Sequence, residues 1–89
     1  MNQAIRKQIE IIKGKIDDLK EAIDAQRQEI ETIKDEEQDK YDNMPEGFQQ
    51  GEKGDALQEV IDSLDNAIND LDSSIGSIDD AIGNLENIQ

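Results

Sequence analysis

Two charged rows, each flanking an apolar seam, constrain the fold of this chain more than any other feature. In each half, Ile and Leu recur at alternating steps of four and three, which is the period of a coiled coil. The residue that follows every second seam position is always basic in the first half: Arg6, Lys13, Lys20, Arg27 and Lys34. In the second half the matching row begins with Gln58 and is then acidic throughout: Asp65, Asp72, Asp79 and Glu86. Because opposite charges in flanking rows select a partner and its direction, the pattern predicts two helices folded back on each other.

The seams place these helices along the 89 residues. We expect one hairpin domain over 1–89, with helices at about 4–40 and about 56–87 and a turn at about 41–54. The first seam consists of Ile5, Ile9, Ile12, Ile16, Leu19, Ile23, Gln26, Ile30 and Ile33. The second consists of Leu57, Ile61, Leu64, Ile68, Leu71, Ile75, Ile78, Ile82 and Leu85. Asp55 is the expected N-cap of the second helix.

The charged rows also predict a register for the hairpin. If Lys20 faces Asp72, the bend is centred on Glu46, between Pro45 and Gly47. Proline cannot continue a helix and glycine favours turns, so turn chemistry and charge indicate the same bend. The full predicted set of opposed residues is Lys34 with Gln58, Arg27 with Asp65, Lys20 with Asp72, Lys13 with Asp79, and Arg6 with Glu86.

The flank of the second helix that lies opposite its acidic row carries small residues. Small side chains let another helix approach closely, and a lone hairpin leaves part of a wide apolar stripe in water. We therefore predict an all-α antiparallel coiled-coil hairpin that dimerises with a second copy into a four-helix bundle. The alternative is that the small residues only complete a single hairpin. The candidate self-association residues are Ala67, Ser74, Ser77 and Ala81.

The net charge of −14 bears on partners and location. It disfavours direct binding to nucleic acid and to anionic membranes, and it favours a basic protein partner. The acidity is concentrated, because residues 41–89 hold 12 acids and one base, Lys53, whereas residues 1–40 hold 11 acids and eight bases. The start of the chain lacks the apolar run of a signal peptide, and no stretch could span a bilayer, so we expect a cytoplasmic protein.

The sequence offers no support for catalysis or for metal binding. The chain has no Cys and no His, which removes the imidazole base and the usual zinc ligands. Asp42, Glu46 and Gly47 match part of a calcium loop, but Lys53 stands where the bidentate acid is required. We therefore predict no catalytic, metal or cofactor-binding residues and a protein that is not an enzyme.

Two surfaces are candidates for binding a protein partner. The turn gathers both aromatic residues of the chain with a methionine and two acids: Tyr41, Asp42, Met44, Glu46 and Phe48. Aromatic anchors of this kind serve recognition, or they cover the open end of the hairpin. The acidic side of the second helix, represented by Asp62, Asp70 and Asp80, is either a docking face for a basic protein or a solubility coat.

The hinge YDNMPEG, Tyr41 to Gly47, resembles that of small acidic proteins of phages and Gram-positive bacteria. These proteins place an acidic Tyr/Phe-Asp-Asn-Met/Leu-Pro-Glu hinge before a helix of repeated Leu-x-x-Ala-Ile type. The likeness covers roughly residues 35–82. It implies a phage or prophage setting, with the protein in the bacterial host cell, and it supplies no activity.

These observations lead to one functional hypothesis with two alternatives. The chain is expected to be a non-enzymatic interaction protein of phage or mobile-element type, which inhibits a host defence or nucleic-acid enzyme through its acidic surface or turn. One alternative is a structural or accessory helical oligomer similar to a scaffold subunit. The other is a small-molecule sponge with pockets between protomers.

Overall fold

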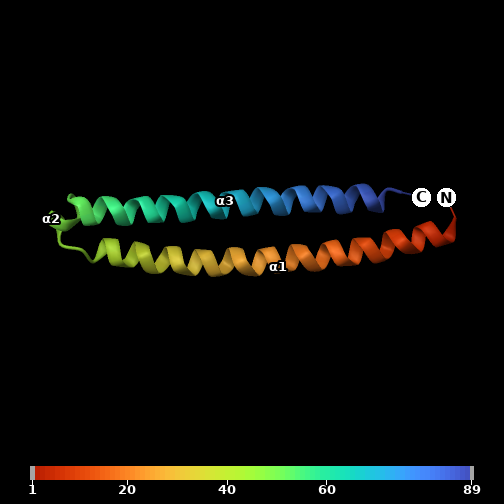
Figure 1. The fold of residues 1–89 in the computed structure, drawn as a ribbon, viewed down its shortest axis with the longest axis horizontal. Helices are drawn as coiled ribbons and strands as arrows, with labels where there is room; N and C mark the ends of the chain where they lie inside the picture. The colour runs from red at the N-terminus through yellow and green to blue at the C-terminus, as the bar shows by residue number, and fades with distance from the viewer. Residues whose placement is uncertain (1, 89) are drawn as a thin grey trace.

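The computed structural model describes residues 2–88, and it shows two long helices lying side by side and antiparallel (Figure 1). The chain forms α1 (Gln3–Asp42), α2 (Glu46–Gln49) and α3 (Glu52–Glu86). The resulting rod measures 69 × 15 × 13 Å. The predicted all-helical hairpin is therefore confirmed, whereas the homodimer remains a prediction.

The ends of the helices differ from the predicted bounds by a few residues. α1 begins after Asn2, whose side-chain Oδ1 accepts a hydrogen bond of 2.9 Å from the backbone N–H of Ile5. α3 begins three residues before the predicted N-cap: its N-cap is Gly51, and Asp55 lies inside the first turn. A carboxylate there still stabilises the helix, because it faces the positive end of the helix dipole.

The turn is more ordered and more asymmetric than the sequence suggested. The chain leaves α1 after Asp42, crosses at Asn43–Pro45, and forms the short helix α2 directly against α3. The side-chain Nε2 of Gln49 reaches back and donates a hydrogen bond of 2.8 Å to the carbonyl oxygen of Tyr41. These two connections hold α2 between the ends of the long helices.

Gly54 allows α2 to approach α3 closely. It is one of the few buried residues, and a Cβ placed on it would lie 2.1 Å from the carbonyl oxygen of Gln49. No side chain fits at that separation, so glycine is required by the contact itself.

The predicted register is wrong by one heptad. The ion pairs between the helices join Lys34 to Asp65, Arg27 to Asp72, Lys20 to Asp79 and Lys13 to Glu86. Each base thus meets the acid seven positions beyond the predicted partner. Charge could not decide between the two arrangements, because each of them joins four bases to four acids. The compact turn decides, since α2 already lies on α3 and moves the centre of the hairpin toward Gln49 and Gln50.

The two seams are covered unequally. Ile61 and Ile68 of α3 are 2% and 7% exposed and are the buried hydrophobic side chains of residues 2–88. No residue of α1 is buried. In α1 only one of the two apolar rows packs against α3, and we call it the inner row: Ile9, Ile16, Ile23 and Ile30, all half-buried. The other, which we call the outer row, is exposed: Ile5, Ile12, Leu19, Gln26 and Ile33.

Candidate interaction surfaces

One long edge of the hairpin is charged, and its basic and acidic side chains form ion pairs with each other within the chain. The basic side chains of α1 lie against the acidic side chains of α3, with nitrogen–oxygen distances of 2.5 Å for Lys34–Asp65, 2.6 Å for Lys20–Asp79, 3.2 Å for Arg27–Asp72 and 3.9 Å for Lys13–Glu86. The four bases are only 22–32% exposed, so their aliphatic stems cover the seam while their charges reach the acids. We call this side the charged edge.

The charged edge shifts the pKa values of its members. A hydrogen bond to Asp79 raises the pKa of Lys20, and one to Asp65 raises that of Lys34. A hydrogen bond from Arg27 lowers the pKa of Asp24 on the same helix. All three shifts favour the charged forms, so the edge is electrostatically matched in the folded chain.

The opposite edge of the hairpin is apolar and open to solvent. The basic row of α1 and the acidic row of α3 face each other on one side of the hairpin. The outer row of α1 and the row of α3 that begins with Val60 therefore share the other side. We call this side the apolar edge. On α1 its large side chains are between 42% and 62% exposed: Ile5, Ile12, Leu19 and Ile33. On α3 it carries Val60, Ala67, Ser74 and Ala81, and Ile88 follows just beyond the end of the helix; Val60 and Ile88 are exposed large hydrophobics.

The candidate self-association residues lie on or beside this apolar edge. Ala67 is half-buried, whereas Ser74, Ser77 and Ala81 are exposed. The hydroxyl of Ser74 donates a hydrogen bond of 3.0 Å to the carbonyl oxygen of Asp70, so its polar group is already satisfied. A second helix could therefore pack over Ser74 without leaving its hydroxyl unpaired.

The turn residues separate into two groups. Tyr41 and Met44 are half-buried, whereas Phe48 is 52% exposed and has the Nζ of Lys53 at 5.5 Å from its ring centroid. Asp42 is exposed and accepts a hydrogen bond of 3.0 Å from Gln38. Glu46, also exposed, stands in the first turn of α2. Only Phe48 among the aromatic candidates therefore presents a broad free surface.

The acidic side of α3 faces outward and is not engaged by the bases that lie along the charged edge. Asp62, Asp70 and Asp80 are exposed, and among residues 2–88 no ion pair includes them. Asp62 accepts one hydrogen bond, of 3.0 Å, from Gln58. We call this surface the acidic face. It is separate from the charged edge, because the bases of α1 are directed at a different row of α3.

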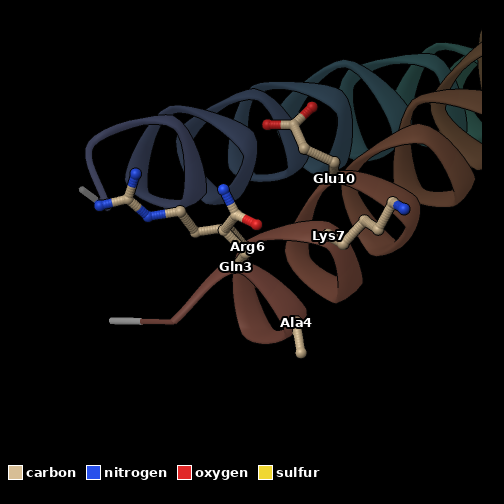
Figure 2. A pocket seen from close by; sticks show the side chains of 5 residues that line it. All are labelled: Gln3, Ala4, Arg6, Lys7 and Glu10. Carbon is tan, nitrogen blue, oxygen red and sulfur yellow. The ribbon is translucent and has the colours of Figure 1, made fainter.

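The hollows on the surface of residues 2–88 are open to solvent. The hollow nearest the start of α1 is lined by Gln3, Ala4, Arg6, Lys7 and Glu10 of that helix alone. Figure 2 shows that these side chains diverge, with Ala4 pointing away from α3. In the described part of the chain, no group of His, Cys, Asp or Glu could hold a metal ion, and no helix is apolar enough over a sufficient length to cross a membrane.

Sequence reasoning missed three structural roles. The sequence does not show that the outer row is exposed, because its residues form one seam with the inner row. The polar residue Gln26 is the one feature of the sequence that indicates weaker burial of this row. Gln49 and Gly54 fall within the predicted turn, but the sequence assigns neither of them a specific contact, because those contacts depend on α2. Comparison with protein-family models, with curated proteins and with solved structures found no match to this chain.

Proposed function

We propose that this chain is a non-enzymatic interaction protein that binds a basic protein partner through the acidic face of α3. The observation that carries this proposal is the division of charge in the hairpin. Four bases of α1 are engaged by the acidic row, while Asp62, Asp70 and Asp80 are exposed and form no ion pair within residues 2–88. An uncompensated anionic surface steers and orients a cationic partner.

The turn extends this surface at one end of the rod. Phe48 offers an exposed ring beside the acids of the hinge, and aromatic anchors commonly supply much of the binding energy at interfaces. The proposal includes inhibition of a host defence or nucleic-acid enzyme, whose basic groove would fit an acidic rod. It includes the phage or mobile-element setting on the resemblance of the Tyr41–Gly47 hinge alone.

Affinity purification with matched charge variants tests this proposal. The chain is used to retain proteins from a nuclease-treated bacterial lysate, alongside a variant with Asp62→Asn, Asp70→Asn and Asp80→Asn. A control variant carries Asp17→Asn, Glu21→Gln and Asp35→Asn, which removes the same charge from exposed positions of α1. We expect a basic protein that is released by salt, retained by the control and lost with the acidic-face variant. Equal retention by both variants would assign the binding to net charge and overturn the proposal.

A second candidate function, a structural or accessory oligomer, is favoured by the apolar edge. Side chains as large as Leu19, at 62% exposure, are uncommon on a surface that has no partner when several of them share one edge. We propose that the hairpin self-associates through this edge into a four-helix bundle, with Ala67, Ser74, Ser77 and Ala81 at or beside the contact. Self-association leaves Asp62 and Asp80 free to bind a partner, whereas Asp70 lies one heptad before Ser77 and borders the proposed contact. Small-molecule binding between protomers stays a prediction.

A further inference from the structure

We propose that two copies of the hairpin pack antiparallel through their apolar edges, with α1 against α1 around a two-fold axis at Ala22. This inference rests on the self-association proposed above. It adds the orientation of the copies, the centre of the contact and an ion pair between them.

The size of the apolar edge favours a second copy as its occupant. From Ile5 to Ile33 the outer row extends for about 42 Å, at roughly 1.5 Å per residue. With the 15 Å width of the rod, the edge offers roughly 600 Å² per protomer, close to the ~800 Å² that each partner buries in a stable complex. α1 itself spans Gln3–Asp42, so an axis at Ala22 lies at its middle and lets the two α1 helices overlap along almost their whole length.

A two-fold axis must cross an uncharged part of the surface, because each residue on the axis meets its own copy. Ala22 and Ala25 provide such a part on α1, and both are exposed. On α3 the level of the axis follows from the Lys20–Asp79 ion pair: two residues along each antiparallel helix lead from that pair to Ala22 and to Ser77. Ser77 lies within an uncharged run, residues 73–78, so α3 is free of charge where the axis would pass, and α1 presents Ala22 and Ala25 there.

Charge complementarity selects this axis among the possible ones. Lys15 is the base that flanks the outer row on the exposed side, and among residues 2–88 it takes part in no ion pair. Lys15 and Glu29 both lie seven positions from Ala22, in opposite directions. In an antiparallel pair centred on Ala22, Lys15 of each copy therefore faces Glu29 of the other, which gives two symmetric ion pairs.

The same axis matches the apolar side chains. Ile11 and Ile33 are 56% and 47% exposed, and each lies eleven positions from Ala22. Ile11 of one copy therefore meets Ile33 of the other, and Leu19 meets the small Ala25, three positions from the axis on either side. On α3 the exposed residues Ser74 and Ala81 flank Ser77, so three of the candidate self-association residues gather near the axis.

Other pairings of Lys15 leave apolar side chains poorly placed. If Lys15 faced Asp18 of the second copy, Ile33 would extend past the start of the opposite chain. If Lys15 faced Glu36, Ile33 would lie against Asp18. Of these three pairings, the one with Glu29 joins the base to an acid and also brings Ile11 of one copy against Ile33 of the other.

Zero-length carbodiimide crosslinking of the intact chain, with mass spectrometry of the products, tests this geometry. Lys15 and Glu29 of one chain stand 14 positions apart on α1, roughly 21 Å, so an amide bond between them can join only two different copies. We expect this crosslink in the dimer fraction. Lys15→Glu should weaken association by about tenfold or more, and adding Glu29→Lys should restore it, because the reversed pair is again complementary. Lys7→Glu, the same charge change on an exposed residue off the apolar edge, should leave association unchanged.

Two results would overturn the inference, and they differ in whether they also overturn the proposed self-association. A chain that sediments as a monomer at high micromolar concentration overturns both this geometry and the proposed self-association. A dimer that lacks the Lys15–Glu29 crosslink and ignores the charge exchange overturns the geometry alone, and the self-association proposal stands. Binding of a basic partner to the acidic face is measured separately and survives either result.

Discussion

The two long edges of this hairpin arise from the same heptad repeat, but the side chains of one edge find partners within the chain and those of the other face solvent. On the charged edge, Lys20, Arg27 and Lys34 each find an acid on α3, so the edge is complete within one chain. On the apolar edge, side chains such as Leu19 and Ile33 face solvent. The difference teaches that the charged edge fixes how the chain folds on itself, whereas the apolar edge is a surface that the chain alone leaves uncovered.

The largest expected effect is a difference in the free energy of unfolding between a substitution in the buried seam and one on the apolar edge. Ile68→Ala removes a side chain that is 7% exposed, and it should lower the free energy of unfolding by about 2–4 kcal/mol through lost burial and a cavity. Leu19→Ala removes a side chain of similar size that is 62% exposed, so it should cost the isolated hairpin much less. Urea unfolding followed by far-UV circular dichroism, at a concentration where the chain is monomeric, measures both variants.

Self-association should reverse that order. Leu19→Ala should weaken dimerisation in sedimentation equilibrium more than Ile68→Ala does, because Leu19 lies on the proposed contact and Ile68 lies inside the hairpin. If Leu19→Ala destabilised the monomer as much as Ile68→Ala, the two edges would not differ in the way described.

A somewhat smaller loss is expected at the turn, which selects the register of the charged edge. Gly54→Ala places a Cβ 2.1 Å from the carbonyl oxygen of Gln49, so α2 must move away from α3. Overpacking of this kind should reduce the free energy of unfolding by about 1–3 kcal/mol. Gly14→Ala is the matched control, because a Cβ there meets nothing within 4 Å, and replacing a glycine inside a helix should add about 0.5–1 kcal/mol. An unchanged unfolding midpoint for Gly54→Ala would show that this contact does not hold the turn.

Crosslinking checks the register directly, with little expected change in stability. Lys20→Cys combined with Asp79→Cys should form an intramolecular bridge with a short thiol crosslinker, because the two side chains already meet. Lys20→Cys combined with Asp72→Cys should not, because Asp72 instead contacts Arg27, one heptad away. The reverse result would restore the register that the sequence alone suggested. Adding Gly54→Ala to both pairs would show whether a disturbed turn lets the hairpin slide by seven residues.

The sequence determined the topology of this fold better than its details. The period of the seams and the opposite signs of the two rows require an antiparallel hairpin, and both are visible without a structure. The register is not, because moving one helix by seven positions carries Lys20 from Asp72 to Asp79 and preserves four ion pairs. The choice between the two registers depends on the close approach of Gln49 to Gly54. This contact forms only in three dimensions and leaves no repeating pattern in the sequence.

The candidate surfaces were predictable in part for a similar reason. The acidic face follows from the spacing of Asp62, Asp70 and Asp80 relative to the acidic row, and the structure places all three outward. The exposure of the outer row does not follow, because a nine-residue seam does not show which of its rows a single partner helix covers. That depends on the rotation of α1, which the stems of the basic row help to set by covering the seam in place of Leu19 and its neighbours.

The smallest expected effect is the response of the charged edge to alkaline pH. Hydrogen bonds to Asp79 and Asp65 raise the pKa values of Lys20 and Lys34 in the folded chain, so the folded state holds their protons more tightly than the unfolded state does. Their contribution to stability is complete below the ordinary lysine pKa of about 10.4, and it is lost as the pH rises through the higher folded values. The melting temperature should therefore stay level through neutral pH and fall only above about pH 10.

Arginine replacement isolates this contribution from the general repulsion of a chain with net charge −14. Lys20→Arg with Lys34→Arg keeps both charges at high pH, because the guanidinium stays protonated, so the alkaline fall in melting temperature should become smaller. Lys7→Arg with Lys53→Arg preserves the same number of charges at exposed positions off the charged edge, and it should change the fall less. Equal protection by the two double variants would mean that overall charge, and not the pairing along this edge, governs the alkaline response. If the first double variant reduces the alkaline fall in melting temperature more than the second, Lys20 and Lys34 hold their protons through their specific partners on α3. That result is expected if the charged edge is completed within one chain.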